Sequence, residues 1–177
     1  VTVVDVATFD SIASITVEWN PQQIVVSGDS VYLLANGQYD EKWRCPYYVQ
    51  SIDVESRTAR TIANATHAVA YDGTLYLCYS ATDWATNETT NTFFTYDVAT
   101  ATLSNQSFLK GDTVEIATNS VYMMEVNPKN GELYIGLAGN KFVSSGVIHR
   151  FEKDGTPIHR FDVQGPNPNQ AAFVNYQ

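Results

Sequence analysis

The chain has 177 residues, of which 44% are hydrophobic and 12% aromatic, and its formal net charge is -9. This composition is typical of one well-packed globular domain and excludes a disordered chain. The acidic balance argues against a nucleic-acid-binding surface, which needs a basic patch, and no apolar run reaches the ~18 residues of a membrane span.

Short apolar runs separated by turn residues predict β-strands along the whole chain. No window carries the spacing and caps of an amphipathic helix. We expect two opening strands, three complete units of four strands and one closing strand. The first partial unit spans residues 1–19, with strands at 2–6 and 11–17. The complete units span about 20–63, 64–118 and 119–163. The last partial unit spans 164–177, with a strand at 170–176.

One sequence motif is repeated in these units: a strand ending in Asp-Val, a short polar turn, and a hairpin that contains a Gly and is centred on a Tyr. A period in the 40s with four short strands per unit predicts the blades of a β-propeller. The expected fold is therefore all-β, a β-propeller of four-stranded antiparallel blades with three complete blades between two partial ones. The copies are Asp5, Asp53 and Asp97, spaced by 48 and 44 residues, and Tyr32, Tyr76 and Tyr134, spaced by 44 and 58.

The recurring Asp and Tyr residues are interpreted as scaffold, because function rarely needs the same residue in every blade. An Asp before a turn can accept backbone N–H groups, and Tyr32 and Tyr76 are expected to be core residues. Fifteen expected strands do not make a whole number of four-stranded blades. A closed four-bladed ring is one interpretation, although it would lack one strand at its seam. The favoured interpretation is a C-terminal segment of a larger propeller, whose end faces are covered by further blades or by homo-oligomerisation.

The sequence of the strands resembles that of the YVTN or YncE-like seven-bladed propeller superfamily. The likeness is carried by VTVVDVATFDSIASITV at 1–17 with NPQQIVV at 20–26, and by VYMMEVNPKNGELYIGLAG at 121–139 with GVIHRFEKDGTPIHRFDV at 146–163. The later phrases are similar, more narrowly, to a Gram-negative surface-lipoprotein propeller family of gut anaerobes that includes a corrinoid-capturing protein. The resemblance covers essentially the whole chain, although its motifs are structural. It implies a location at the cell surface or in the periplasm, outer-membrane anchoring of the full-length protein, an outer-membrane transporter as partner, and a corrinoid or glycan as ligand.

Ligand-binding residues are expected at the mouth of the ring, on loops between the second and third strands of a blade and at blade-to-blade connections. Those loops are 36–47, 81–91 and 139–145, and each contains an aromatic residue. An exposed Trp usually packs on a neighbour or stacks on a ligand, so ligand contact and loop anchoring both remain open. For His67, at the start of an inner strand, a capped or core-facing role also remains open. The candidates are Tyr39, Trp43, Arg44, His67, Asp83, Trp84, Asn140, Lys141 and Phe142.

Trp19 lies just before a predicted blade-to-blade turn and is expected to pack between blades. His149 and His159 lie on neighbouring strands of one hairpin and could face each other. An exposed polar pair explains them equally well, and no third metal ligand has suitable spacing. Cys45 and Cys78 have no metal-binding spacing and are expected to be free thiols.

No nucleophile elbow, P-loop or dinucleotide fingerprint occurs in the sequence, so we predict no catalytic residue, no metal and no cofactor. The leading hypothesis is a non-enzymatic surface or exported module that captures a small ligand or docks on an outer-membrane transport partner. One alternative is a lactonase- or lyase-like propeller enzyme, since related folds host such chemistry. The other alternative is a structural scaffold for protein interactions.

Overall fold

Short strands and tight turns fold into three consecutive four-stranded antiparallel sheets, preceded by a two-stranded hairpin. The computed structural model describes residues 1–41, 45–139 and 143–174. The hairpin pairs β1 (Thr2–Val4) with β2 (Ser11–Ser14), and the first sheet contains β3 (Pro21–Ser27), β4 (Ser30–Asn36), β5 (Tyr47–Asp53) and β6 (Thr58–Ala63). The second sheet contains β7 (His67–Tyr71), β8 (Thr74–Asp83), β9 (Glu88–Asp97) and β10 (Thr102–Leu103), and the third contains β11 (Val121–Val126), β12 (Leu133–Leu137), β13 (Val147–Phe151) and β14 (Pro157–Asp162).

The hairpin turns are built by residues that tolerate positive φ and by Asp side chains. Gly28 and Gly73 have φ of 57° and 73°, the conformation that favours glycine. The Asp5 carboxylate accepts the N–H groups of Ala7 and Thr8, Asp53 accepts that of Ser56, and Asp97 that of Thr100. The Thr100 hydroxyl also donates to Asp97, and these bonds stabilise the charged carboxylates and lower the pKa of all three Asp residues. The expected turn role of the repeated Asp is confirmed.

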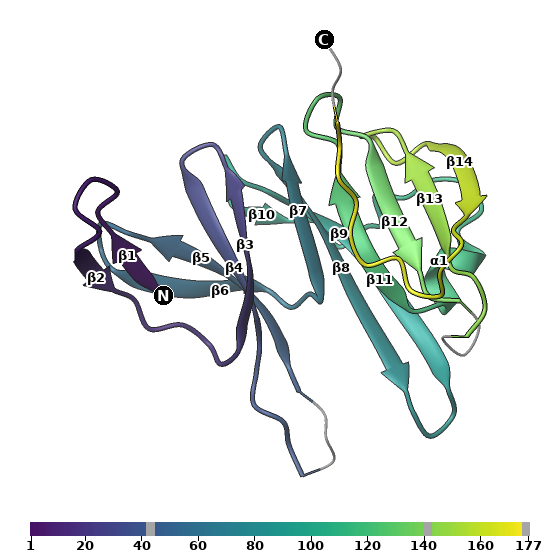
Figure 1. The fold of residues 1–177 in the computed structure, drawn as a ribbon, viewed down its shortest axis with the longest axis horizontal. Helices are drawn as coiled ribbons and strands as arrows, with labels where there is room; N and C mark the ends of the chain where they lie inside the picture. Colours follow the sequence, from purple (N-terminus) through teal and green to yellow (C-terminus); the bar gives the residue numbers. More distant parts are fainter. Residues whose placement is uncertain (42–44, 140–142, 175–177) are drawn as a thin grey trace.

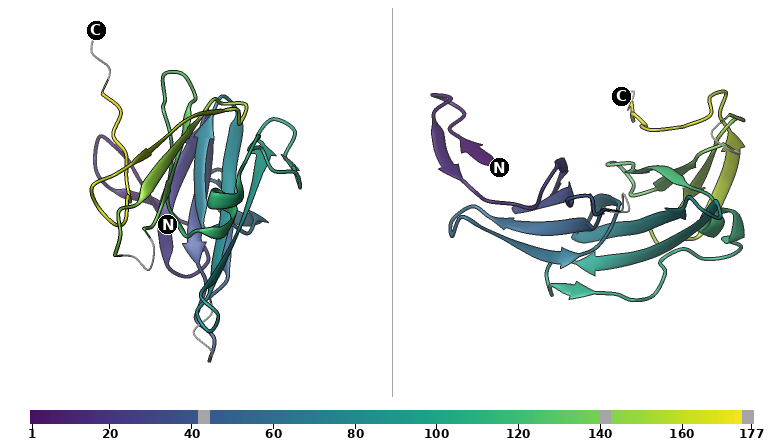
Figure 2. Two further views of the ribbon diagram at one scale, coloured as in Figure 1. Left: turned by 90° about the vertical axis from the view of Figure 1, so that its right-hand side faces the viewer. Right: turned by 90° about the horizontal axis from the view of Figure 1, so that it is seen from below.

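The sheets stand side by side in an open arc, and their first strands β3, β7 and β11 are neighbours (Figures 1 and 2). Two apolar layers fill the spaces between sheets. Tyr32 and Leu34 pack against Leu75 and Leu77 between the first and second sheets. Between the second and third sheets lies the other layer, which includes Tyr76, Phe93, Leu133, Ile135 and Phe151.

In the third sheet burial decreases from the inner to the outer strands, as the sequence predicted, whereas in the first sheet the inner strand β3 is mostly exposed. In β12 four of five residues are buried, whereas all six residues of β14 are exposed. Tyr32 and Tyr76 are buried core residues, as expected, and Cys78 is fully buried. Burial raises the pKa of the Cys78 thiol, which keeps it protonated.

Four details of the expected strand pattern are wrong. The second opening strand ends at Ser14, the outer strand of the second sheet has only two residues, and a five-residue helix, α1 (Val114–Thr118), follows it. No strand forms over 163–174. Backbone hydrogen bonds hold that segment instead, from the Gly139 N–H to the Pro166 carbonyl oxygen at 2.7 Å and from the Gly146 N–H to that of Gly165 at 2.9 Å. Further along, the Phe173 ring packs edge-on against Tyr134 with centroids 5.1 Å apart.

Helix α1 was missed because five residues are too few to show a helical period. Its Ile116 is fully buried between sheets, which makes the turn an anchor for the connection. No helix in the described part of the chain is long and apolar enough to cross a membrane.

Candidate ligand-binding groove

A groove of about 700 Å³ lies where the three inner strands begin. We call it the mouth groove. Gln22 and Gln23 of β3, His67 of β7 and Tyr122 of β11 come from the starts of these strands. Because each inner strand belongs to a different sheet, all three sheets contribute to the wall. Its other described residues are Leu34, Asn36, Tyr39, Cys45, Tyr47, Thr66, Tyr79, Ser80, Ala81, Thr82, Trp84, Ser120 and Val121.

Trp84 is carried into position by an unusually long hairpin. Strands β8 and β9 have ten residues each and remain paired as far as Asp83 and Glu88, so the hairpin projects beyond the neighbouring strands (Figure 1). The expected loop over 81–91 is therefore mostly strand, with a turn at its tip. The Thr82 and Thr89 hydroxyls lie 2.9 Å apart and brace the extension.

The groove contains several aromatic rings at different depths. The side chains of Trp84 and Tyr39 are 69% and 56% exposed, although each has a neighbouring interaction within the protein. Beneath them Tyr47 of β5 and Tyr79 of β8 meet edge to face, with centroids 6.1 Å apart and ring planes at 79°. This pair joins the first and second sheets under the groove.

Cys45 lies beside the tyrosines of the groove. Burial raises the pKa of the Tyr47 hydroxyl, and the nearby Cys45 thiol raises it further. The same thiol raises the pKa of Tyr39. Both phenols therefore remain protonated and neutral at physiological pH, and can donate as well as accept hydrogen bonds.

His67 is held by a hydrogen-bond network at the start of β7. The Thr66 hydroxyl lies 2.9 Å from His67 Nδ1, 3.0 Å from the Cys78 carbonyl oxygen and 2.9 Å from the Ser80 backbone nitrogen. A hydroxyl has one proton to donate, so all three contacts are hydrogen bonds together only if Thr66 donates to Cys78 and Nδ1 donates to Thr66. Burial lowers the pKa of His67 to about 4, which keeps the ring neutral. Its Nε2 atom is then an acceptor.

The structure brings three of the sequence candidates together. Tyr39, His67 and Trp84 all line the mouth groove. Asp83 does not line it, since its carboxylate accepts the N–H of Ala85 within the hairpin turn. The remaining candidates lie outside the described residues: Trp43, Arg44, Asn140, Lys141 and Phe142.

Sequence reasoning missed other lining residues, notably Tyr47, Tyr79 and Tyr122. They lie on strands rather than loops. The sequence feature that could have indicated them is the clustering of Tyr at the mouth ends of strands. The expected packing of Trp19 is wrong, because this side chain is 61% exposed. Before Trp19, the backbone is held by a hydrogen bond from the Glu18 N–H to Gln50 Oε1. After it, Asn20 adopts a positive φ of 48°.

Of the two alternatives for His149 and His159, the one in which they face each other is wrong. In the register of β13 and β14, His149 lies opposite Arg160 and His159 opposite Arg150. His149 Nε2 lies 2.9 Å from Glu115 Oε2, and Arg160 donates two hydrogen bonds to the same carboxylate. The cluster thus joins α1 to the third sheet. Within the described residues, no group of three His, Cys, Asp or Glu side chains is arranged to hold a metal.

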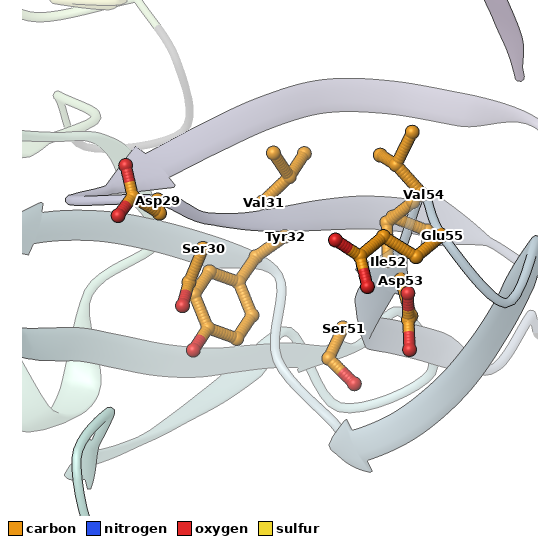
Figure 3. Close-up of a pocket in the computed structure, with 9 residues that line it drawn as sticks. All are labelled: Asp29, Ser30, Val31, Tyr32, Ser51, Ile52, Asp53, Val54 and Glu55. Carbon is orange, nitrogen blue, oxygen red and sulfur yellow. The ribbon is translucent and has the colours of Figure 1, made fainter.

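A second hollow, of about 420 Å³, lies at the opposite ends of the strands, beside the β3–β4 and β5–β6 turns (Figure 3). It carries the carboxylates of Asp29, Asp53 and Glu55. The Asp53 carboxylate already accepts the Ser56 N–H. This hollow is therefore explained by turn structure, and the mouth groove is the better candidate for ligand binding.

Comparison with known proteins identifies the fold. No family model and no curated protein matches the chain. Among solved structures, it is similar to the β-propeller domain of the Trilobed protease from Pyrococcus furiosus, described as having an open velcro topology. Identity is 12%, the TM-score is 0.50, and the match covers 81% of this chain and 43% of that one. This chain thus has an all-β propeller fold with partial blades, and spans less than half of the related chain.

Proposed function

We propose that this chain is a non-enzymatic binding module whose ligand site is the mouth groove. The observation that carries the proposal is the convergence of Tyr39, His67 and Trp84 from three separate segments on one cavity of about 700 Å³. Pockets of this size, with aromatic walls and a few polar groups, are typical of small-molecule sites.

The chemistry of the wall supports capture of a ligand rather than cleavage of a bond. Its polar groups include the amides of Gln22, Gln23 and Asn36 and several hydroxyls. Amides and hydroxyls orient a ligand through hydrogen bonds but do not exchange protons near neutral pH. The neutral His67 adds an acceptor to this set.

The proposal includes a cellular setting, which the resemblance to surface-lipoprotein propellers supports. In this setting the module is exported, is held at the outer membrane in its full-length form, and passes its ligand to an outer-membrane transport partner. The ligand classes that suit both the resemblance and the aromatic wall are corrinoids and glycans.

A second candidate function is a protein-interaction scaffold. Ile24 and Val26 of β3 favour it, since they are 58% and 59% exposed on the innermost strand of the first sheet. Apolar side chains gathered on an exposed sheet face mark a possible contact surface. This surface is separate from the wall of the mouth groove, so the two functions can be tested apart.

The test is a comparison of two tryptophan variants. Fluorescence titrations with cyanocobalamin and with neutral hexasaccharides should show binding of at least one probe by the unmodified protein. We expect Trp84→Ala to weaken that binding about 10-fold or more, as loss of a central aromatic contact does. Trp19→Ala is the matched control, because Trp19 is exposed but does not line the groove. Equal affinity in both variants would place the site elsewhere.

A further inference from the structure

We propose that the ligand of the mouth groove is a neutral oligosaccharide. The inference rests on the proposed function, and it selects one ligand class from the chemistry of the described wall.

The first argument is the arrangement of the aromatic rings. Tyr39 comes from the segment after β4, Trp84 from the tip of the β8–β9 hairpin and Tyr122 from β11. Each side chain is more than 40% exposed. A pyranose ring has an apolar face of C–H bonds that packs on an aromatic ring, while its hydroxyls remain at the rim. Exposed aromatic rings from three segments of one groove therefore offer surfaces on which sugar rings can pack.

The second argument is the shape of the floor. The Tyr47 and Tyr79 rings meet at 79°, so they do not form one flat shelf. A wide planar macrocycle would need nearly coplanar rings beneath it. A jointed chain of sugar rings can follow platforms that differ in orientation, because each glycosidic linkage lets the next ring turn.

The third argument is the hydrogen-bonding character of the wall. The amides of Gln22, Gln23 and Asn36 both donate and accept, and the neighbouring Ser80 and Thr82 hydroxyls do the same. Sugar hydroxyls also have both capacities, so the two sets are complementary in either direction. His67 adds a fixed acceptor, since its Nδ1 proton is directed to Thr66.

The fourth argument is charge. Among the described residues that line the groove there is no Asp, Glu, Lys or Arg. Against this described part of the wall, a charged ligand would lose hydration without gaining an opposite charge. The net charge of -9 further disfavours an acidic ligand. A neutral ligand avoids both costs.

The test measures ligand class and location together by isothermal titration calorimetry. The neutral probes are cellohexaose, xylohexaose, mannohexaose and maltohexaose, the acidic probe is hexagalacturonate, and the macrocycle is cyanocobalamin. We expect at least one neutral hexasaccharide to bind. Its affinity should fall about 10-fold or more in both Trp84→Ala and Tyr39→Ala. Trp19→Ala should retain the affinity of the unmodified protein, and circular dichroism should confirm that every variant is folded.

The possible outcomes separate this inference from the proposed function. Binding of cyanocobalamin alone, weakened by Trp84→Ala, would overturn the oligosaccharide inference and leave the binding module in place. Tighter binding of hexagalacturonate than of any neutral sugar would do the same. Sugar binding that neither groove variant weakens would overturn both the inference and the assignment of the groove. Binding of none of the six probes would also count against both.

Discussion

At the scale of single residues, His67 shows how burial fixes a chemical role. Its ring is partly enclosed at the mouth, and desolvation lowers its pKa to about 4, from an ordinary value of 6.5. The unfolded chain therefore binds a proton at a pH where the folded chain does not. This group consequently costs the protein stability as pH falls below about 6.5, until the folded pKa is reached.

This difference predicts a measurable dependence of stability on pH. Between pH 7.5 and pH 5, His67 should lower the free energy of unfolding by about 2 kcal/mol. The His67→Gln variant lacks the titrating ring and should lose less stability over the same range. Urea unfolding of both proteins at the two pH values measures these changes in the free energy of unfolding. The acidic residues contribute equally to the change in both proteins, so their contribution cancels in the difference. If both proteins lost the same stability, His67 would not be neutral for the reason given.

At the scale of elements, helix α1 is held by one buried side chain from the neighbouring sheet. The Asn91 Nδ2 group of β9 donates to the carbonyl oxygens of Ile116 and Asn119, at 2.6 Å each. Asn91 is 9% exposed, so these carbonyls have little access to replacement water. The ion pair of Glu115 with Arg160, together with the hydrogen bond between Glu115 and His149, holds the same helix from its exposed side.

The two attachments should differ in energy. Asn91→Ala should destabilise the protein by about 1–3 kcal/mol, because it leaves two carbonyls without a donor. Asn91→Asp should cost more, since a carboxylate would face both oxygens. Glu115→Gln should cost at most about 1 kcal/mol, as exposed ion pairs contribute little. Denaturant unfolding measures all three variants, and a larger loss for Glu115→Gln than for Asn91→Ala would reverse the assignment.

Sequence reasoning worked best for repeated elements and least well for joints between them. The strand periodicity, the Asp turns and the buried Tyr32 and Tyr76 recur from unit to unit, so each copy supports the others. Helix α1 and the irregular segment over 163–174 occur once and depend on distant contacts, such as Asn91 with Ile116 and Tyr134 with Phe173. No local pattern encodes such contacts.

The same reason limits what could be predicted of the groove. Tyr39 and Trp84 were found because they stand out in loops, and His67 because it begins an inner strand. Tyr79 was missed because, on a strand, a tyrosine at the mouth end looks like any other half-buried strand residue. Tyr47 is the last residue of the expected loop over 36–47, where nothing local distinguishes it from its neighbours. Which tyrosines face the groove follows from the sheet register and from the neighbouring sheet, and neither is local in the sequence.

At the scale of the whole molecule, stability depends on the layers between sheets. Tyr76 of the second sheet is 7% exposed, packs edge-on against Phe108 and donates its hydroxyl proton to the Lys153 carbonyl oxygen beside the third sheet. One side chain thus contributes both apolar area and a directional bond to the joint between two sheets.

Removal of this side chain should weaken the joint in two separable steps. Tyr76→Phe loses only the hydrogen bond and should cost about 1 kcal/mol. Tyr76→Ala also leaves a cavity and should cost about 3–5 kcal/mol. Chemical denaturation of the three proteins measures both steps. A cost for Tyr76→Ala no larger than that for Tyr76→Phe would show that the ring is not part of the core.

The position of the mouth groove across all three sheets has a mechanical consequence. In the described part of the chain, the inner strands β3, β7 and β11 are neighbours but belong to three separate hydrogen-bonded sheets. A molecule that contacts the starts of all three strands would therefore link the three sheets to one another. Its binding energy would oppose every motion that spreads the sheets apart. The ligand-bound protein would therefore be more rigid than the free protein. A partner at the rim could then distinguish the loaded protein from the empty one without touching the ligand.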